Sequence, residues 1–291
     1  MLALYTDTDC DVTPFNLTEY NYKLISMPYS LDGETCVYPY ADGKEIDFHA
    51  FYDELRNGLL PTTSAVGKET YISAFEAEFA AGNDVLYVHF SRAMSASFGN
   101  MDAAVAELRE KYPERKFYAV DTKGITTISY AITAEVGKMI KEGKTPEEVV
   151  EWSKAGADTF AMYFFADDLK FFRRSGRVSG LAAMMGTLVG IRPIIYMSPE
   201  GKMVSCGKER GRYKAVDKII SMLDEIGDHP EDHPIYIGHT DADDIVEEVC
   251  SMIRAKYPEK TLEIRVIPCN PTSGAHAGPD GVGICFRSKS R

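Results

Sequence analysis

The sequence lacks the cysteine pattern of a secreted or zinc-binding protein. Its 291 residues include six cysteines, and no two of them form a CxxC pair. Disulfide frameworks and structural zinc sites need paired or closely spaced cysteines, so scattered thiols favour a reduced, cytoplasmic protein. The N-terminus also has no basic stretch followed by an apolar run, which a signal peptide requires. We therefore expect a cytoplasmic location.

Positive charge and long apolar runs are scarce as well. The chain has 32 Lys and Arg against 44 Asp and Glu, a formal net charge of −12. Nucleic-acid binding depends on Lys and Arg contacts to phosphate, so we expect no nucleic-acid partner. The longest weakly polar stretch, residues 180–197, contains Arg192 and Pro193. Both are costly in lipid, so we expect no integral membrane segment.

Several enzyme motifs are missing. The stretch "TTSAVGKET" (62–70) resembles a P-loop, but it lacks the first glycine and the Ser or Thr after the lysine. The sequence has no GxGxxG fingerprint and no GxSxG elbow. His229 and His233 have a metal-like separation, but each precedes a proline, so they do not share a helix face. We expect no metal ion and no cofactor.

What is present is an alternation of strands and helices. Residues 84–121 and 234–267 each read as an apolar β-rich run, a helical stretch and a second β-rich run. The helical stretches close on Tyr-Pro-Glu, at Pro113 and Pro258. Proline cannot continue a helix, so both helices should end just before it. This alternation predicts an α/β fold.

A strong helix start precedes the middle of the chain. Thr145, Pro146 and Glu148 form a capping box with proline at the first helical position. A glycine and an aromatic run follow, and we place a domain junction there. The prediction is an N-terminal α/β domain over residues 1–157 and a C-terminal α/β domain over residues 158–291.

The C-terminal half gives three further expectations. Residues 169–197 should contain a turn, a helix and a strand. The stretch "PEGKMVSCGKERGR" predicts a hairpin with Gly201 in its turn. The next helix, residues 213–227, carries apolar residues at helical spacing.

Three segments carry hydroxyl or imidazole side chains. They are residues 59–67 with a Thr-Thr-Ser run, residues 89–100 with three serines, and residues 270–286 with His276. By itself each has an ordinary explanation: the hydroxyls cap helices, and the histidine bonds a backbone carbonyl. The second segment follows a predicted strand, which is where open α/β sheets bind ligands.

The order of these segments resembles that of the DegV family, the bacterial fatty-acid-binding proteins. The resemblance extends nearly end to end, and no single motif is strong alone. The matching segments are residues 6–8, 63–67, 91–98, 120–122, 175–179 and 274–279.

The resemblance implies a two-domain DegV-like fold. Its N-terminal α/β/α domain has a parallel sheet, its C-terminal α/β domain has a mixed or antiparallel sheet, and the ligand lies between them. That ligand is a long-chain fatty acid with a buried tail, its carboxylate held by Thr63, Ser95 and His276. Two hydroxyls and an imidazole N–H suit a carboxylate, which only accepts hydrogen bonds. A protonated His276 would make that bond charge-assisted.

The same resemblance implies a partner. Family members present the bound lipid to an ATP-binding fatty acid kinase subunit, which phosphorylates the carboxylate to an acyl phosphate. The protein itself is then a lipid-binding subunit in phospholipid metabolism and not an enzyme. Arg177 is the residue expected to assist this coupling. Arg210, in the basic stretch "KERGRYK", is a second candidate, although a solvated surface explains that stretch equally well.

Other interpretations remain open. Ser95 and His276 would serve a small-molecule hydrolase or transferase as nucleophile and base, with Asp280 the nearest orienting acid in sequence. A lipid-sensing regulatory protein is a third possibility. Met184 and Met185 lie in a weakly polar run that predicts core, and methionines there would also suit an acyl tunnel.

The chain departs from the family pattern inside the three segments. Ala65 and Val66 replace Gln-Pro, and alanines replace both threonines beside the histidine, at Ala275 and Ala277. Ala96 stands where the family has glycine, and alanine adopts positive φ at a higher cost. These changes imply an altered ligand preference or a weaker hold on the carboxylate.

Overall fold

The computed structural model describes residues 1–180 and 190–291. Met184 and Met185, expected in the core or a tunnel wall, lie outside the described residues. The first half of the chain forms a four-stranded sheet in the order β2-β1-β5-β6, with every neighbouring pair parallel. Its strands are β1 (Leu2–Asp7), β2 (Lys23–Ile25), β5 (Asp84–His89) and β6 (Phe117–Asp121).

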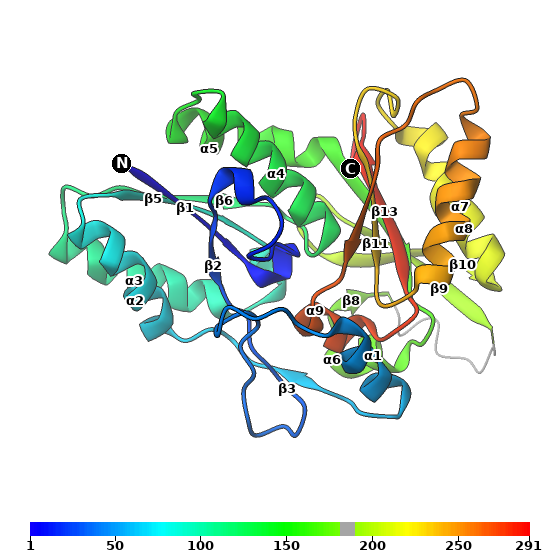
Figure 1. Cartoon of the computed structure of the whole chain (residues 1–291), viewed down its shortest axis with the longest axis horizontal. Helices are drawn as coiled ribbons and strands as arrows, with labels where there is room; N and C mark the ends of the chain where they lie inside the picture. The colour runs from blue at the N-terminus through cyan, green and yellow to red at the C-terminus, as the bar shows by residue number, and fades with distance from the viewer. Residues whose placement is uncertain (181–189) are drawn as a thin grey trace.

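Helices cover both faces of this sheet (Figure 1). Helices α2 and α3 bury aromatic residues against one face, and α4 and α5 bury aliphatic residues against the other. The alternation of side chains along β5 explains this, because Tyr87 points to α2 whereas Leu86 and Val88 face α4. These helices are α2 (Lys68–Ala80), α3 (Ser97–Lys111), α4 (Thr127–Lys141) and α5 (Pro146–Gly156).

The second half forms a seven-stranded sheet in the order β12-β11-β13-β7-β9-β10-β8. Its pairs are antiparallel except β11 with β12 and β10 with β8, so the sheet is mixed. The predicted fold class, a parallel-sheet half and a mixed-sheet half, is confirmed. The strands are β7 (Phe160–Phe165), β8 (Val178–Ser179), β9 (Ile191–Met197), β10 (Met203–Arg210), β11 (Ile235–His239), β12 (Ile264–Pro268) and β13 (Val282–Arg287).

Helix α4 lies between the two sheets, and α7 (Arg212–Ile226) and α8 (Asp243–Lys256) cover the outer face of the second (Figure 1). Along β13, Ile284 packs toward α7 and α8, and Cys285 points inward. Among the described residues, no helix combines the length and the apolar character needed to cross a membrane.

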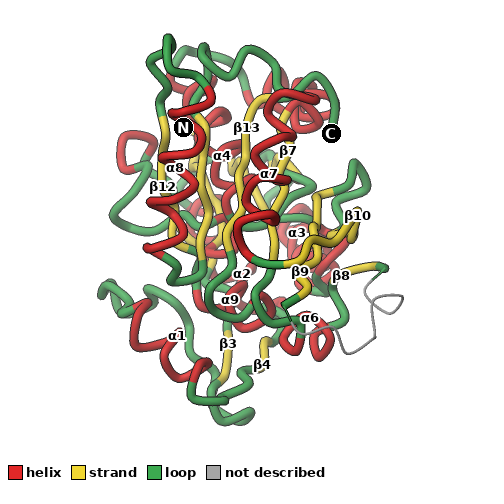
Figure 2. The backbone as a smooth tube through the Cα atoms, turned by 90° about the vertical axis from the view of Figure 1, so that its right-hand side faces the viewer, coloured by secondary structure: helices red, strands yellow, loops and turns green. Residues whose placement is uncertain are grey.

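Short elements gather at one end of the molecule (Figure 2). A small aromatic cluster that includes Phe51, Tyr52 and Phe171 holds α1, α6 and α9 together. The elements are β3 (Tyr29–Ser30), α1 (Phe48–Arg56), β4 (Thr62–Thr63), α6 (Lys170–Ser175) and α9 (Pro271–Ala277). The described residues also form short 3-10 helices, which are η1 (Thr8–Cys10), η2 (Thr18–Tyr20), η3 (Arg92–Met94) and η4 (Ala157–Thr159).

Local signals in the sequence predicted several elements correctly. Helices α3 and α8 end two residues before Pro113 and Pro258. The capping box of α5 is formed on both sides, and Gly201 occupies the turn between β9 and β10 with φ +76°. The proposed domain boundary at 157/158 falls in η4 and stays a proposal.

Two local expectations were wrong. The Thr-Thr-Ser run does not cap α2: the N-cap is Gly67, and Thr62–Thr63 instead form β4, which pairs with β3. His276 bonds the Thr63 hydroxyl and not a backbone carbonyl. It stands on the short helix α9, which Asn270 caps and Pro271 starts. Within residues 169–197, where a turn, a helix and a strand were expected, the structure has α6, β8 and β9, and residues 181–189 lie outside the described residues.

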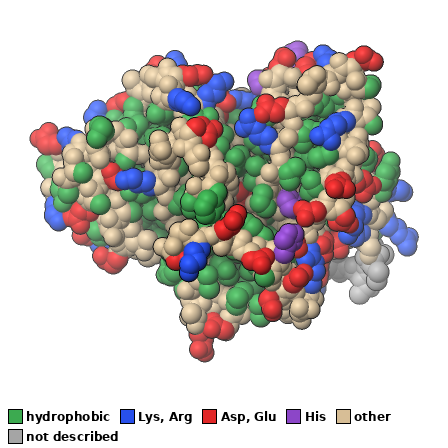
Figure 3. All heavy atoms as spheres, in the orientation of Figure 1, with side chains coloured by type: hydrophobic (Ala, Val, Ile, Leu, Met, Phe, Trp, Pro, Cys, Tyr) green, Lys and Arg blue, Asp and Glu red, His purple; other side chains and the backbone are tan. Residues whose placement is uncertain are grey.

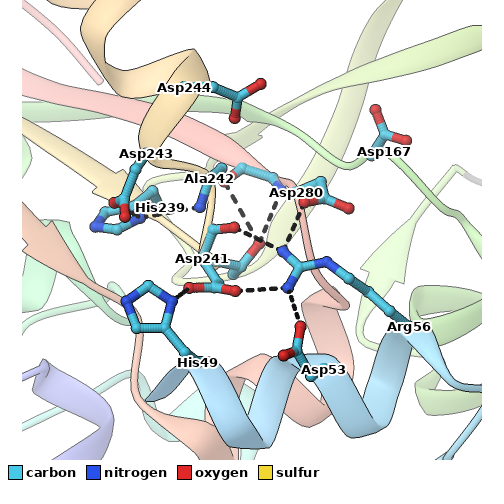
Figure 4. Close-up of polar contacts among 12 residues, drawn as sticks. His49, Asp53, Arg56, Asp167, His239, Asp241, Ala242, Asp243, Asp244 and Asp280 are labelled. Carbon is cyan, nitrogen blue, oxygen red and sulfur yellow. Dashed lines mark hydrogen bonds and ion pairs between the residues drawn. The ribbon is translucent and has the colours of Figure 1, made fainter. Parts of the chain in front are cut away.

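Helix α1 is tied to the second half by one arginine (Figure 4). Arg56 donates to the Asp53 carboxylate at 2.9 Å, to the Asp241 carboxylate at 2.6 Å and to Asp280 at 2.8 Å. His49 contacts the same Asp241 carboxylate, whose side chain is only 7% exposed. The planar guanidinium serves three acids from separate segments, which lysine cannot do with the same geometry.

The β9–β10 turn joins the two halves on another side. Ser91 Oγ donates to the carbonyl of Gly201 at 2.7 Å. A Cβ at Gly201 would lie 2.2 Å from that oxygen and 3.3 Å from the Cα of Lys123. Glycine is therefore required there both for its left-handed backbone and for the close approach.

We expect Gly201→Ala to lower the free energy of unfolding by about 2 kcal/mol, because it strains the turn and displaces the Ser91 hydroxyl. Urea denaturation measures the change. Gly207→Ala in the same hairpin is the matched control, since its Cβ would meet only Ile194, at 3.9 Å. Equal stability of both variants would contradict this account of the turn.

Candidate functional site

A cavity of about 300 Å³ lies between the two halves of the molecule. The first half contributes residues from the ends of β1 and β5 and the start of α4, and the second contributes the inner face of its sheet with α6 and α9. Much of the wall is apolar, which suits an aliphatic ligand. Representative apolar residues of the wall are Met27, Phe90, Ile125, Met162, Phe164 and Met203.

Thr63, Ser95 and His276, which the family resemblance indicated, all line this cavity. Thr63 Oγ1 and His276 Nε2 share a hydrogen bond of 2.9 Å, although 213 positions separate them in the chain. Whichever of these two atoms donates, the pair keeps one hydrogen, on the threonine oxygen or on the other ring nitrogen. The pair therefore offers a donor to a ligand in the cavity.

Ser95 belongs to a separate hydrogen-bond network in the same wall. Its Oγ donates to Ser97 Oγ at 3.0 Å and accepts from Ser97 N–H at 3.2 Å. Ser97 Oγ in turn accepts the Val66 N–H at 3.0 Å. The network ties the serine segment to the threonine segment and fixes where the Ser95 hydroxyl stands. That Thr63, Ser95 and His276 bind a ligand stays a prediction.

The electrostatics of His276 differ from those of an exposed histidine. Burial and, to a smaller extent, the positive charges of Arg177 and Arg174 together lower its pKa to about 4. The imidazole is therefore neutral near pH 7 in the ligand-free protein, and a charge-assisted bond would require a ligand that raises this pKa.

The small residues around His276 allow α9 to pack closely. Tyr52 donates its hydroxyl hydrogen to the carbonyl of Cys269 at 2.9 Å, just before the helix. A Cβ at Gly274 would lie 2.4 Å from that hydroxyl oxygen. A larger residue would push α9 away from α1 and displace the imidazole.

The departures from the family pattern do not strain the backbone. Ala96 has φ −72°, so positive φ is not needed there. Val66 is buried, and its carbonyl accepts a hydrogen bond from Asn100 at 2.8 Å. Ala277 lines the cavity, and Ala275 is buried against the aromatic cluster of α1. Ala65, Ala96 and Ala277 thus change the wall of the cavity, whereas Val66 and Ala275 pack outside it.

Arg177 and Arg210 occupy different places. Arg177 is exposed and also lines the cavity, at the start of β8. Arg210 is exposed at the far end of β10 and does not line it. Because Val178 pairs with Met203, seven strand residues separate the two positions, roughly 23 Å. On the face drawn in Figure 3, charges of both signs are mixed.

Sequence reasoning missed a buried acidic group at the end of β1. Asp9 lines the cavity and is 6% exposed, and its carboxylate accepts a hydrogen bond from Ser273 at 3.0 Å. Asp11 is also buried and accepts from the backbone and side chain of Asn270, at 3.0 and 2.8 Å. The available signal was the spacing of Asp7, Asp9 and Asp11, since acids this dense at the end of a buried strand are seldom accidental.

The groups needed for hydrolysis are not joined. Asp280 binds Arg56, His276 bonds to Thr63 and Ser95 bonds to Ser97. A nucleophile, base and acid should instead form a chain of hydrogen bonds. In residues 1–180 and 190–291, no three His, Cys, Asp or Glu side chains are grouped to hold a metal ion.

Comparisons with known proteins identify the family of this chain. The family model described as "Uncharacterised protein, DegV family" matches residues 1–289. A DegV domain-containing protein of Clostridium perfringens is 29% identical, with 98% of this chain and 96% of that protein covered.

Solved structures share the fold. A stearic-acid-binding protein from Eubacterium ventriosum has a TM-score of 0.86 at 19% identity, and a DegV family protein from Thermus thermophilus, described by its fatty acid binding, has 0.85 at 21%. Each comparison covers 99% of both chains. The family match over almost the whole length, together with this fold, shows that the chain belongs to the DegV family.

Proposed function

We propose that the protein binds a long-chain fatty acid, with the tail between the two halves and the carboxylate at Thr63, Ser95 and His276. The observation that carries this proposal is the cavity itself, which combines an apolar wall with these three side chains. Relatives with the same fold are described as binding stearic acid and other fatty acids.

The energetics support a division between tail and head. A tail of about 14 methylenes, at about 0.8 kcal/mol each, offers on the order of 10 kcal/mol before ordering costs. The carboxylate gains less, because its hydrogen bonds to water are exchanged for hydrogen bonds to protein. Affinity then comes mainly from the tail, and Thr63, Ser95 and His276 orient the head group.

We further propose that the carboxylate is presented to an ATP-binding fatty acid kinase subunit, which converts it to an acyl phosphate. Neutral donors hold the head group here, so a carboxylate oxygen keeps its nucleophilic character. Arg177 supports this proposal because it is exposed and also reaches the cavity, where an arginine suits phosphate.

Titration of delipidated protein with hexadecanoic acid tests the binding proposal. Thr63→Ala, Ser95→Ala and His276→Ala should each weaken binding by about three- to tenfold, the effect of one lost hydrogen bond. Thr62→Ala is the matched control, since Thr62 is exposed and does not line the cavity. Failure of the unaltered protein to bind the acid, or equal losses in the control, would refute the proposal.

The protonation of His276 gives a second prediction. Without ligand its imidazole should titrate near the low value of about 4, and a bound carboxylate should raise its pKa by favouring the charged ring. Nitrogen-15 NMR of labelled histidines reports this, with His276→Gln identifying the resonance. An ordinary pKa in the ligand-free protein, or no rise with ligand, would contradict the site described above.

The role of Arg177 is tested separately. Arg177→Ala should leave hexadecanoic acid binding within about twofold and lower the rate of acyl phosphate formation by about tenfold or more, because the lost group meets the phosphate and not the tail. The assay uses ATP and a bacterial fatty acid kinase subunit. Equal loss of lipid binding would show that Arg177 holds the head group instead.

A further inference from the structure

Exposed apolar side chains are concentrated in the α1 lobe, residues 31–60. The lobe contains α1 and lies at the lower end of the molecule in Figure 1. Among the described residues eight large hydrophobic side chains are exposed, and four of them, Leu31, Val37, Tyr38 and Leu60, belong to this lobe. Scattered exposed apolar residues are ordinary, whereas residues gathered in one place indicate an interaction surface.

Strand pairing brings the four side chains together. Strand β3 pairs with β4 on one side, and Tyr29 of β3 bridges to Val37 on the other. Leu31 directly follows β3 and Leu60 stands two residues before β4, so both lie at the same end of this antiparallel pair. Tyr38 follows Val37 in the chain. The exposed apolar residues therefore surround one small sheet.

This surface borders the polar end of the cavity. Thr63, which shares a hydrogen bond with His276, pairs with Tyr29 in the same ladder. Leu31 lies two residues beyond Tyr29, so its Cα stands roughly 8 Å from the Cα of Thr63. A partner that reaches a carboxylate held by Thr63 therefore meets the α1 lobe.

The arginines of the cavity wall are next to the lobe as well. Arg174 of α6 donates to the carbonyl of Pro61 at 3.0 Å, which fastens α6 to the segment between α1 and β4. Arg177, which lines the cavity and is exposed, stands three residues further along the chain. The α1 lobe and Arg177 thus border the same end of the cavity.

Contacts with the second half hold the lobe in place. Arg56 joins α1 to Asp241 and Asp280 (Figure 4), and Tyr52 of α1 donates to the carbonyl of Cys269 at 2.9 Å. A surface that is fixed before binding loses little conformational entropy when a partner docks. The lobe is therefore suited to a stable contact with another protein.

The charge of the lobe indicates the chemistry of that partner. Residues 31–60 contain seven Asp and Glu against two Lys and Arg, a formal net charge of −5. A kinase subunit surrounds the phosphates of ATP with Lys, Arg or Mg²⁺, so its reacting face is positive. Opposite potentials favour association. An anionic lipid surface and a second copy of the lobe would both be repelled.

Resting on the kinase partnership proposed above, we propose that the α1 lobe is the docking surface for the ATP-binding kinase subunit. The exposed apolar side chains pack against the partner, and the acidic side chains around them face basic residues. Docking there brings the ATP phosphates to the carboxylate end of the cavity, beside Arg177. The lobe does not hold the fatty acid, so its residues control the affinity for the kinase subunit and not lipid binding.

Acyl phosphate formation tests this, with protein loaded with hexadecanoic acid as the varied substrate of a bacterial fatty acid kinase subunit. The double variant Glu34→Gln/Glu45→Gln removes two exposed acids of the lobe. It should raise the KM for the loaded protein about threefold to tenfold and leave kcat within about twofold, because it weakens docking alone. Tyr38→Ala should raise the KM about tenfold.

The matched control is Glu110→Gln/Glu114→Gln, which removes two exposed acids at the end of α3. Glu110 stands roughly 20 Å along the helix axis from Ser97, which lines the cavity. This control should keep the KM of the unaltered protein. Added NaCl should lower kcat/KM of the unaltered protein more than that of the Glu34/Glu45 variant, because the variant has less charge to screen.

Hexadecanoic acid binding, measured on every variant, should stay within about twofold of the unaltered protein. An unchanged KM in the lobe variants overturns the docking proposal and leaves fatty acid binding and phosphorylation intact. Weaker lipid binding by these variants also overturns it, since the lobe then shapes the ligand site. So does a lobe variant that loses self-association or binding to phosphatidylglycerol vesicles while its KM is unchanged. If the loaded, unaltered protein yields no acyl phosphate, the kinase partnership itself fails.

Discussion

The site depends on how the short helix α9 is docked. Asn270 caps this helix with its side-chain oxygen and donates twice to Asp11, at the end of the first strand. That buried link between positions 259 residues apart sets the height of α9 above the first sheet. His276 stands on the last turn of α9 and reaches Thr63 from there. If α9 moved away by about 1 Å, the hydrogen bond between Thr63 and His276 would be lost.

This docking combines segments that have no other reason to meet. The Asp11 carboxyl belongs to the N-terminal half, and α9 lies between strands of the second sheet in sequence. Burial raises the pKa of Asp11, and the two bonds from Asn270 limit the rise, so that the pKa is about 8. The protein thus keeps a titratable group buried against the start of α9, and the Asn270 bonds reduce the cost of burying it. Arg56 on α1 also holds two segments of the cavity wall. It forms ion pairs with Asp241 and Asp280, whose chain neighbours Thr240 and Gly281 line the cavity.

Sequence reasoning was reliable where the signal was local. The capping box at Thr145, the turn at Gly201 and the stops before Pro113 and Pro258 are decided by a few neighbouring residues. Family resemblance supplied Thr63, Ser95 and His276, which spacing alone could not bring together. Contacts between distant segments were missed. Thr62–Thr63 form β4, which pairs with β3 and does not cap a helix. Asp9 lines the cavity. Neither the β3–β4 pairing nor the position of Asp9 can be predicted from neighbouring residues, because both depend on segments distant in the sequence.

The account is tested most directly by the lipid that the protein carries. Mass spectrometry of an organic extract from the purified, denatured protein identifies this lipid and its molar amount. We expect close to one long-chain monocarboxylic acid per chain, because Thr63, Ser95 and His276 line a single cavity with much apolar surface. An extract without such an acid, from protein shown to be folded, would contradict the account.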